Sequence, residues 1–417
     1  MQFAVVNPGS LSAEGRSLVH DIDKLVGQGM PQANFGAYLG HVDPDLENSS
    51  AAYWGSNVPR LQSLKGKFDE NDIFHNPQSL SFGSKVIGEN YNRKPTKELL
   101  KIDTHHHFVP ADLSFDFSSG PLHDFKVAAS RLPRWSPSAS EDYMDMAGGE
   151  GMAILSFPLL FAFPEDSQAT VARKVNDYAA QLRSHAPSRF GFFAAVPTLH
   201  NPEAALAEIT RSFDELKADG IVLLAKYGDK YLGHPSFAPI WKELNARSAV
   251  VFVHPGTTFR NTVINKYVDP AVADFPHETT QTALDMIMND TVRTNSKCKI
   301  ILSHAGGTLP YLIGRASSLI PFFAAHIEPP PKSAVEITED FKLFYLDLAL
   351  SSTPYVLDSL LRNFPKDRIL YGSDYPFAPP PSTISLARAL DSYEMDDETR
   401  EMIYWRNACE IIPRLRR

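Results

Sequence analysis

Ile102-Asp-Thr-His-His-His107 is the most informative stretch of the chain. A run of six residues that follows a polar segment has the length of a typical strand. Because side-chain direction repeats every two residues along a strand, His105 and His107 point to the same side and can bind one cation together. Asp103 shares that side and either binds weakly, orients a histidine or is simply polar. His106 points the other way and is expected to pack or to support the site from behind.

Seven further apolar runs follow along the chain, separated by longer amphipathic or loop segments. Short runs rich in β-branched and aromatic residues, separated by helical patterns such as residues 202–216, are typical of parallel strands. Together with residues 102–107 they predict an α/β fold of the (β/α)8 TIM-barrel type. The seven runs are residues 151–157, 190–196, 220–225, 249–254, 299–304, 343–349 and 368–374.

Polar residues stand at the ends of four of these eight runs. The first run ends in His105 and His107, the fifth in His254, the sixth in His304 and the eighth in Asp374. In barrels of this type the chemistry lies where the strands end, so these side chains are expected to meet. Imidazoles with one carboxylate suit Zn²⁺, Mn²⁺ or Fe²⁺ better than Ca²⁺ or Mg²⁺. We therefore predict a metal site, with Zn²⁺ as the favoured ion and Mn²⁺ as the alternative.

The composition changes near residue 100, where the polar stretch 88–97 precedes the first strand. We expect a boundary there, with residues 1–95 forming an N-terminal appendage and residues 101–417 forming the barrel. A chain of 417 residues is long enough for one large fold with such an appendage.

The overall composition is that of an ordinary globular chain, with 43 % hydrophobic and 21 % charged residues. The formal charge is −9 and no basic stripe is present, so no nucleic acid partner is expected. No signal peptide and no apolar run of membrane-spanning length is found, which predicts a cytoplasmic protein without a membrane partner. Cys298 and Cys409 are expected to be free, buried or half-buried thiols.

Four stretches together resemble the amidohydrolase superfamily, within it the branch of aminocarboxymuconate-semialdehyde decarboxylase and of the 6-methylsalicylate- or orsellinate-type decarboxylases. They are residues 102–110, 251–255 (Val-Phe-Val-His-Pro), 303–315 (Ser-His-Ala-Gly-Gly-Thr-Leu-Pro-Tyr-Leu-Ile-Gly-Arg) and 369–376 (Ile-Leu-Tyr-Gly-Ser-Asp-Tyr-Pro). The resemblance implies that one divalent metal is bound by His105, His107, His254 and Asp374. It also implies that His304 stays near the metal and handles a proton or orients the substrate.

The same resemblance points to residues that bind the substrate. Arg315 matches an arginine that grips a substrate carboxylate across a subunit interface, which implies a homodimer; the alternative is a charge on a helix surface. The semialdehyde decarboxylases carry a second arginine soon after a Trp-x-Pro sequence, whereas no Arg or Lys follows Trp135-Ser-Pro137 before Asp145. A small aromatic monoacid is therefore the expected substrate. Trp135 is expected either to form a wall of its pocket or to pack in the core.

The first part of the chain resembles the C-terminal tail of berberine-bridge-type FAD oxidases over residues 10–82. The matching stretches are residues 34–38, 43–46, 53–65 and 68–79. The FAD-binding domain that precedes such a tail has no counterpart in this sequence, so we predict that the chain binds no FAD. We interpret the segment as a fusion of neighbouring genes or a vestigial appendage, with short helices around residues 11–27 and 57–67.

Three functions are compatible with these patterns. The first is metal-dependent, non-oxidative decarboxylation of a 2-hydroxybenzoate such as 6-methylsalicylate or orsellinate, in fungal secondary metabolism. In this reaction Asp374 would protonate the ring carbon and His304 would assist. The second is hydrolysis of an ester, lactone or amide, in which the metal lowers the pKa of bound water and Asp374 takes its proton. Lys226, just beyond the fourth run, supports this alternative as a carbamylated ligand between two metals; otherwise it is a loop lysine. The third is a non-catalytic binding role. The complete ligand set argues against the third, and the resemblance favours the first.

Overall fold

The structure is a computed structural model that describes residues 53–68, 100–113, 132–133, 135–148, 151–256, 264–265 and 267–416. The chain divides into two units, Met1–Arg93 and Lys94–Arg417.

In the first unit the described residues form one helical segment, in which η1 (Gly55–Asn57) leads into α3 (Val58–Phe68). Pro59 stands in the first turn of α3, where a missing N–H costs nothing. The helix expected around residues 57–67 is confirmed. The helix expected at residues 11–27, and the tail-like stretches other than 53–65, lie outside the described residues.

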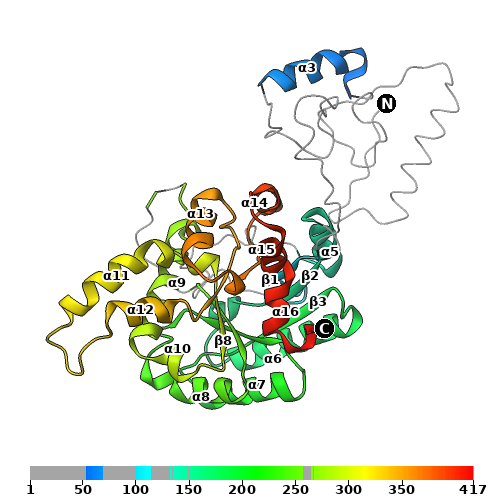
Figure 1. Cartoon of the computed structure of the whole chain (residues 1–417). Coiled ribbons are helices and arrows are strands. Elements are labelled where there is room, and N and C mark those ends of the chain that lie inside the picture. Colours follow the sequence, from blue (N-terminus) through cyan, green and yellow to red (C-terminus); the bar gives the residue numbers. More distant parts are fainter. Residues whose placement is uncertain are drawn as a thin grey trace. The chain divides into compact units, whose positions relative to one another are not determined.

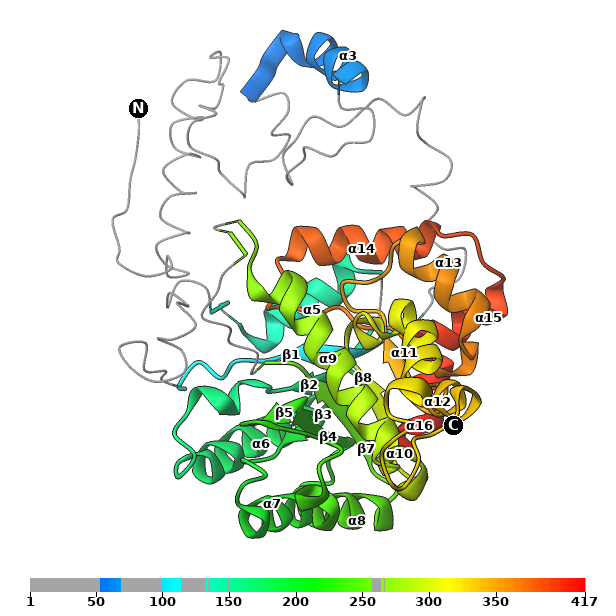
Figure 2. The ribbon, with the colours of Figure 1, turned by 90° about the vertical axis from the view of Figure 1, so that its left-hand side faces the viewer.

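Eight parallel strands form the sheet of the second unit, in the order β1-β2-β3-β4-β7-β8-β9-β10. Each predicted run contains one of these strands, and the helices surround them (Figures 1 and 2). The strands are β1 (Ile102–His107), β2 (Met152–Ser156), β3 (Phe190–Ala195), β4 (Gly220–Leu224), β7 (Val250–His254), β8 (Lys299–Leu302), β9 (Tyr345–Asp347) and β10 (Ile369–Leu370).

Backbone hydrogen bonds join the segment after β10 to β1 and bring the sheet round into a barrel. The Thr104 N–H donates to the Tyr371 carbonyl oxygen at 3.0 Å, and the His107 N–H donates to the Tyr375 carbonyl oxygen at 2.7 Å. His106 and Tyr375 also form a parallel bridge. The fold is the (β/α)8 barrel that the sequence predicts.

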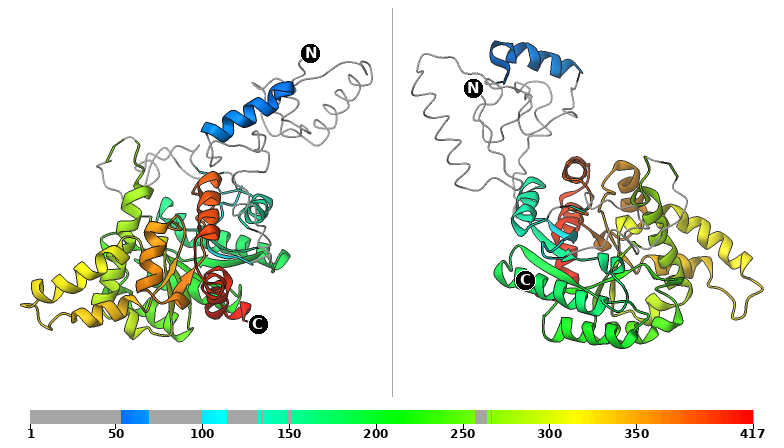
Figure 3. Two further views of the ribbon diagram at one scale, coloured as in Figure 1. Left: turned by 45° about the horizontal axis from the view of Figure 1, so that its top comes forward. Right: turned by 180° about the vertical axis from the view of Figure 1, so that it is seen from behind.

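Helices follow the strands and cover the outside of the sheet (Figure 3). At the start of α7 (Pro202–Asp214) the Asn201 side chain accepts a hydrogen bond from the Ala204 N–H, and Ala205 and Ile209 of this helix are buried. This helix confirms the one expected at residues 202–216. The other α-helices are α5 (Pro137–Met146), α6 (Gln168–His185), α8 (Ala238–Ala246), α9 (Pro270–Met288), α10 (Thr291–Thr294), α11 (Leu309–Phe323), α12 (Ala334–Phe341), α13 (Pro354–Asn363), α14 (Pro380–Ser392), α15 (Asp397–Glu401) and α16 (Asn407–Ile411).

Shorter elements lie in the connections. An antiparallel hairpin of β5 (Lys226–Tyr227) and β6 (Lys230–Tyr231) follows β4, and its turn contains Gly228 at a φ of +59°. Glycine adopts this backbone conformation without steric cost. The 3-10 helices of this unit are η3 (Leu159–Ala162), η4 (Pro235–Phe237), η5 (His304–Gly306), η6 (Lys366–Arg368) and η8 (Pro413–Leu415), and η7 (Met402–Arg406) is a π-helix.

Two strands end before the polar residue that the sequence places at their ends. β8 ends at Leu302 and β10 at Leu370, so His304 and Asp374 lie in the segments that follow. The reason is the backbone: φ is +54° at His304 and +66° at Asp374, values that a strand does not contain. Such left-handed residues other than glycine are uncommon and cluster at functional sites. The backbone conformation of the loops after β8 and β10 therefore sets the direction of the His304 and Asp374 side chains; the alternation of side chains along a strand does not.

Both cysteines are free thiols, with Cys298 buried and Cys409 half-buried, as expected. Burial raises the pKa of Cys298 to about 12, so its thiol stays protonated at neutral pH. Among the described residues, no helix has both the length and the apolar character needed to cross a bilayer.

Candidate metal centre

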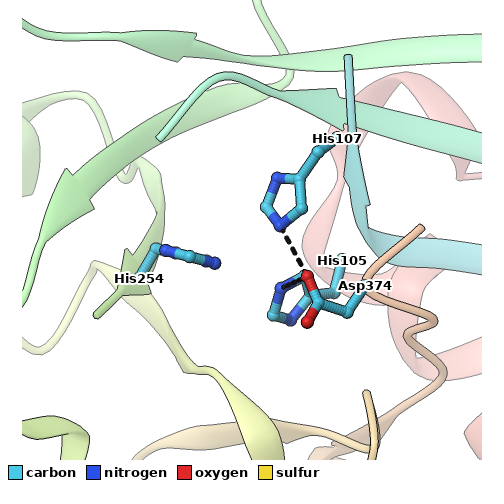
Figure 4. Close-up of side chains that lie close together, drawn as sticks. All are labelled: His105, His107, His254 and Asp374. Atoms are coloured by element: carbon cyan, nitrogen blue, oxygen red, sulfur yellow. Dashed lines mark ion pairs between the residues drawn. The ribbon is translucent and has the colours of Figure 1, made fainter. Parts of the chain in front are cut away.

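Four side chains from three parts of the barrel point toward one another at the carboxyl ends of the strands (Figure 4). His105 and His107 come from β1, His254 is the last residue of β7, and Asp374 follows β10. One nitrogen or oxygen atom from each lies within 4.8 Å of the others. The spacing of His105 and His107 on one strand and the meeting of the strand ends thus produce the cluster that the sequence predicts.

The outer nitrogens of the two β1 histidines are held by hydrogen bonds. His105 Nδ1 lies 3.0 Å from Asp347 Oδ2, and His107 Nδ1 lies 2.9 Å from Ser156 Oγ. The Ser156 hydroxyl donates to the His106 carbonyl oxygen at 3.3 Å, so it accepts the proton of His107 Nδ1. With Nδ1 as the donor in both rings, each Nε2 faces the cluster and offers its lone pair to a cation whenever the ring is neutral.

The inner nitrogens are the unusual feature of the site. His254 Nδ1 bonds to the Pro255 carbonyl oxygen, so its Nε2 also faces the cluster. The Nε2 atoms of His105, His107 and His254 are all buried without a hydrogen-bond partner among the described residues. A buried polar atom without a partner costs free energy, and three that converge indicate a bound cation. Three imidazole nitrogens and one carboxylate suit Zn²⁺ or Mn²⁺.

Asp374 supplies the negative charge of the cluster. Its Oδ1 lies 3.4 Å from His105 Nε2 and 3.1 Å from His107 Nε2. Burial alone would raise the pKa of Asp374, but the two histidines beside it hold that pKa well below its usual range. The carboxylate is therefore ionised at neutral pH and available to a cation.

The histidines differ in their affinity for protons. Burial lowers the pKa of His107 to about 4 and takes that of His254 well below its usual range. Burial also acts on His105, but the carboxylates of Asp347 and Asp374 outweigh it and raise the pKa of His105 to about 10. Because a ligating imidazole must be neutral, a cation that binds here displaces the proton of His105.

His304 lies beside the cluster and is not one of its four members. Its ring centre is 4.8 Å from that of His105 and 6.2 Å from that of His254. The backbone N–H donates to Asp347 Oδ1 at 3.2 Å, and Nδ1 lies 3.1 Å from the Ala349 carbonyl oxygen. Burial and the nearby His105 lower the pKa of His304, so its ring is neutral at pH 7.

Asp347 is the site residue that sequence reasoning missed. It is fully buried at the end of β9, where Oδ2 binds His105 and Oδ1 accepts from the backbone N–H groups of His304 and Ala349. The Asp347 carboxylate thus orients the ring of His105, a predicted ligand, and holds the backbone of the neighbouring His304. The available signal was an acidic residue inside the apolar run 343–349, at the end of a predicted strand.

We expect Asp347→Asn to weaken metal binding by about 10-fold to 100-fold, because the ring of His105 would lose its charged partner. The measurement is the metal dissociation constant, from competition with a chromophoric chelator. Asp340→Asn is the matched control: Asp340 is also fully buried and paired, but with Arg293 and Lys332. Equal metal affinity in Asp347→Asn and the wild type would contradict the assigned role.

The other predicted residues lie outside the ligand cluster. Asp103 does not join the ligands and binds His106 instead. Trp135 is buried against Phe108, the residue that follows His107. Arg315 is exposed on α11, and the structure shows no contact between it and the cluster.

The chain belongs to the amidohydrolase family. The family model described as amidohydrolase matches residues 102–414, a range that includes all four members of the cluster. A second model, described as berberine and berberine like, matches residues 37–81. Both resemblances seen in the sequence are confirmed, the second over part of the stretch.

Relatives and solved structures agree with this assignment. A 6-methylsalicylic acid decarboxylase of Penicillium expansum is 36 % identical over 324 residues, which cover 76 % of this chain and 98 % of that protein. A 6-methylsalicylic acid decarboxylase of Aspergillus aculeatus is 35 % identical, with coverages of 76 % and 97 %. A solved dihydroxybenzoic acid decarboxylase of a Polaromonas species, with bound manganese and 2-nitroresorcinol, is 25 % identical. Its TM-score is 0.62, with coverages of 76 % and 98 %.

Proposed function

We propose that this protein is a metal-dependent, non-oxidative decarboxylase of a small aromatic hydroxy acid of the 6-methylsalicylate or orsellinate type. The observation that carries the proposal is the convergence of three buried imidazole nitrogens, which make no hydrogen bond among the described residues, with the Asp374 carboxylate. The decarboxylases of Penicillium expansum and Aspergillus aculeatus support the reaction, because the match covers nearly their whole length.

We assign the metal to His105, His107, His254 and Asp374. A divalent cation bound there would act as a Lewis acid toward the carboxylate and the neighbouring hydroxyl oxygen of the substrate. The chain fixes the three rings through their Nδ1 atoms, so the ligand geometry exists before the cation arrives. The bound manganese of the Polaromonas enzyme supports Mn²⁺ beside Zn²⁺.

The reaction consumes one proton per turnover. The bond from the ring carbon to CO₂ breaks, a C–H bond forms at the same carbon, and the ring regains its aromaticity. We assign the final proton transfer to Asp374, whose carboxylate lies within the ligand cluster. Because its pKa is low, Asp374 must receive that proton during turnover. His304 assists: with Nδ1–H donated to the Ala349 carbonyl oxygen, its Nε2 is an acceptor for the proton of the substrate hydroxyl.

The remaining assignments come from the sequence and stay predictions. Trp135 as a pocket wall, Arg315 as a partner of the substrate carboxylate, the homodimer and the cytoplasmic location belong to this group. The absence of FAD and a place in fungal secondary metabolism stay predictions as well. The exposed position of Arg315 on α11 is compatible with a contact across a subunit interface.

Hydrolysis is not favoured. The sequence supported a hydrolase through Lys226 as a carbamylated ligand. Lys226 lies on β5 with its ammonium 5.8 Å from the centre of the Tyr231 ring. A cation over an aromatic ring is a sufficient structural role for this side chain.

A substrate panel tests the proposed function. Metal-loaded and metal-stripped protein would be incubated with 6-methylsalicylate, orsellinate and salicylate, and with esters and lactones of similar size. We expect CO₂ release from at least one 2-hydroxybenzoate by the metal-loaded protein only. Cleavage of an ester or lactone without release of CO₂ from any acid would replace the proposal with the hydrolase.

A shortened chain tests the role of the N-terminal unit. The match covers 98 % of the Penicillium expansum enzyme with 76 % of this chain, so the barrel alone corresponds to almost all of that enzyme. We therefore expect a chain that starts at Lys97 to keep its fold, its metal and its activity. The readouts are circular dichroism, elemental analysis and CO₂ release. If a folded, metal-loaded barrel were inactive, the first unit would contribute to the site or to assembly.

A further inference from the structure

A chain of hydrogen bonds runs behind the metal centre. The Trp135 Nε1–H donates to Ser140 Oγ at 2.8 Å, and Ser140 Oγ lies 2.9 Å from His106 Nε2. His106 Nδ1 lies 3.0 Å from Asp103 Oδ2. All four side chains are buried, and those of His106 and Ser140 are completely inaccessible to solvent. None of them belongs to the ligand cluster.

The chemistry of these groups fixes which atom donates and which atom accepts in each of these hydrogen bonds. An indole nitrogen only donates, so Ser140 Oγ accepts from Trp135 and has its own proton available for His106 Nε2. His106 then carries its single ring N–H proton on Nδ1 and donates it to the carboxylate of Asp103. Every polar atom in the sequence of bonds has a partner, which is the condition for a buried network to hold one arrangement.

The second oxygen of Asp103 connects this chain to the ligands. Oδ1 accepts from the backbone N–H of His105 at 3.2 Å and from the backbone N–H of Ser373 at 3.0 Å. His105 is itself a predicted ligand, and Ser373 immediately precedes the ligand Asp374. A single carboxylate therefore ties together two ligand-bearing segments that lie 270 residues apart in the sequence.

An irregularity in β1 makes this contact possible. The pairing of β1 with β2 shifts register between Asp103 and His106. Bulges of this kind re-aim side chains and are frequent next to active sites. Because of this register shift, the His106 side chain contacts the carboxylate of Asp103, although strict alternation would place the two residues on opposite faces of β1.

We propose that Asp103 and His106 are a positioning pair, which fixes the backbone of His105 and Asp374 for metal binding. Ser140, supported by Trp135, holds the His106 ring in the orientation that this requires. The inference rests on the proposed metal site and extends it, because none of these side chains supplies a ligand atom.

Three substitutions of His106 separate its two hydrogen bonds. The amide nitrogen of His106→Asn stands near the position of Nδ1 and can still donate to Asp103. In His106→Gln the amide stands near the position of Nε2 and reaches Ser140, and His106→Phe makes neither bond. The readouts are the Zn²⁺ and Mn²⁺ dissociation constants, from chelator competition, and kcat at saturating metal. We expect the Gln and Phe variants to bind metal about 10-fold or more weakly, and the Asn variant to stay within about 3-fold of the wild type.

Thr104→Val is the matched control for damage to the strand. Thr104 is buried in β1 beside His105 and donates from Oγ1 to the Tyr371 carbonyl oxygen at 2.9 Å, outside the chain of bonds. We expect this variant to lose thermal stability and to keep the wild-type metal affinity. If His106→Phe does not fold, the isosteric Asp103→Asn takes its place, with the same expected loss of affinity.

The outcomes distinguish this inference from the site on which it rests. A wild type that binds no metal would refute the site and the inference with it. Wild-type affinity in the folded Gln and Phe variants, or in Asp103→Asn, would refute the positioning pair alone. Equal losses of metal affinity in His106→Asn and His106→Phe would also refute the positioning pair, because the hydrogen bond from His106 to Asp103 would then make no difference to metal binding.

Discussion

Asp374→Asn is expected to lose decarboxylation by about 10³-fold or more, while a weakened metal site remains. The amide oxygen can still approach a cation, but an amide cannot protonate carbon. Loss of a general acid typically costs 10²- to 10⁴-fold in rate, and the weaker metal site adds to this. The measurements are metal content by elemental analysis and the rate of CO₂ release at saturating metal, compared with the wild type.

His304→Asn is the companion variant that separates proton handling from metal binding. His304 lies outside the ligand cluster, with its ring centre 4.8 Å from that of His105. We expect near-normal metal content and slower turnover in this variant. If Asp374→Asn decarboxylated at close to the wild-type rate, another group would be the acid, and His304 would be the first candidate.

His254→Ala is expected to lose metal and activity together. The buried Nε2 of His254 faces the cluster without another partner, and an incomplete set of ligands binds a transition metal far more weakly. We expect metal content to fall from about one ion per chain to near zero after dialysis, with CO₂ release falling in proportion. The fold should survive, since the backbone pairing of β7 with β4 and β8 does not involve the His254 side chain.

His326→Ala is the control for His254→Ala. It also removes one histidine, but His326 is exposed beyond α11, away from the cluster. We expect wild-type metal content and activity in this control. Full occupancy and normal turnover in His254→Ala would remove the assignment of the site.

The barrel could be predicted from the sequence because its strands are buried on both faces. Such strands give continuous apolar runs, and the eight runs each contain one strand. The ends of β8 and β10 could not be predicted in the same way. The positive φ values of His304 and Asp374 depend on loop conformation, which apolar patterning does not record.

The convergence of His105, His107, His254 and Asp374 was also predictable, because these residues stand at the ends of predicted strands. The residues that orient the ligands were not. Asp347 reaches His105 from a strand 242 residues further along the chain, and its position inside an apolar run does not reveal which residue it contacts. The pairing of Asp103 with His106 was hidden for a different reason. Strict alternation along β1 places them on opposite faces, and only the register shift brings them together.

Turnover of 6-methylsalicylate in D₂O by the metal-loaded protein tests the central claim most directly. We expect CO₂ and 3-methylphenol in equal amounts, with one deuterium at the ring carbon that carried the carboxylate, because that carbon takes its proton from an exchangeable group. Substrate consumption without CO₂, or a methylphenol with no deuterium at that carbon, would contradict a decarboxylase that works by protonation of the ring.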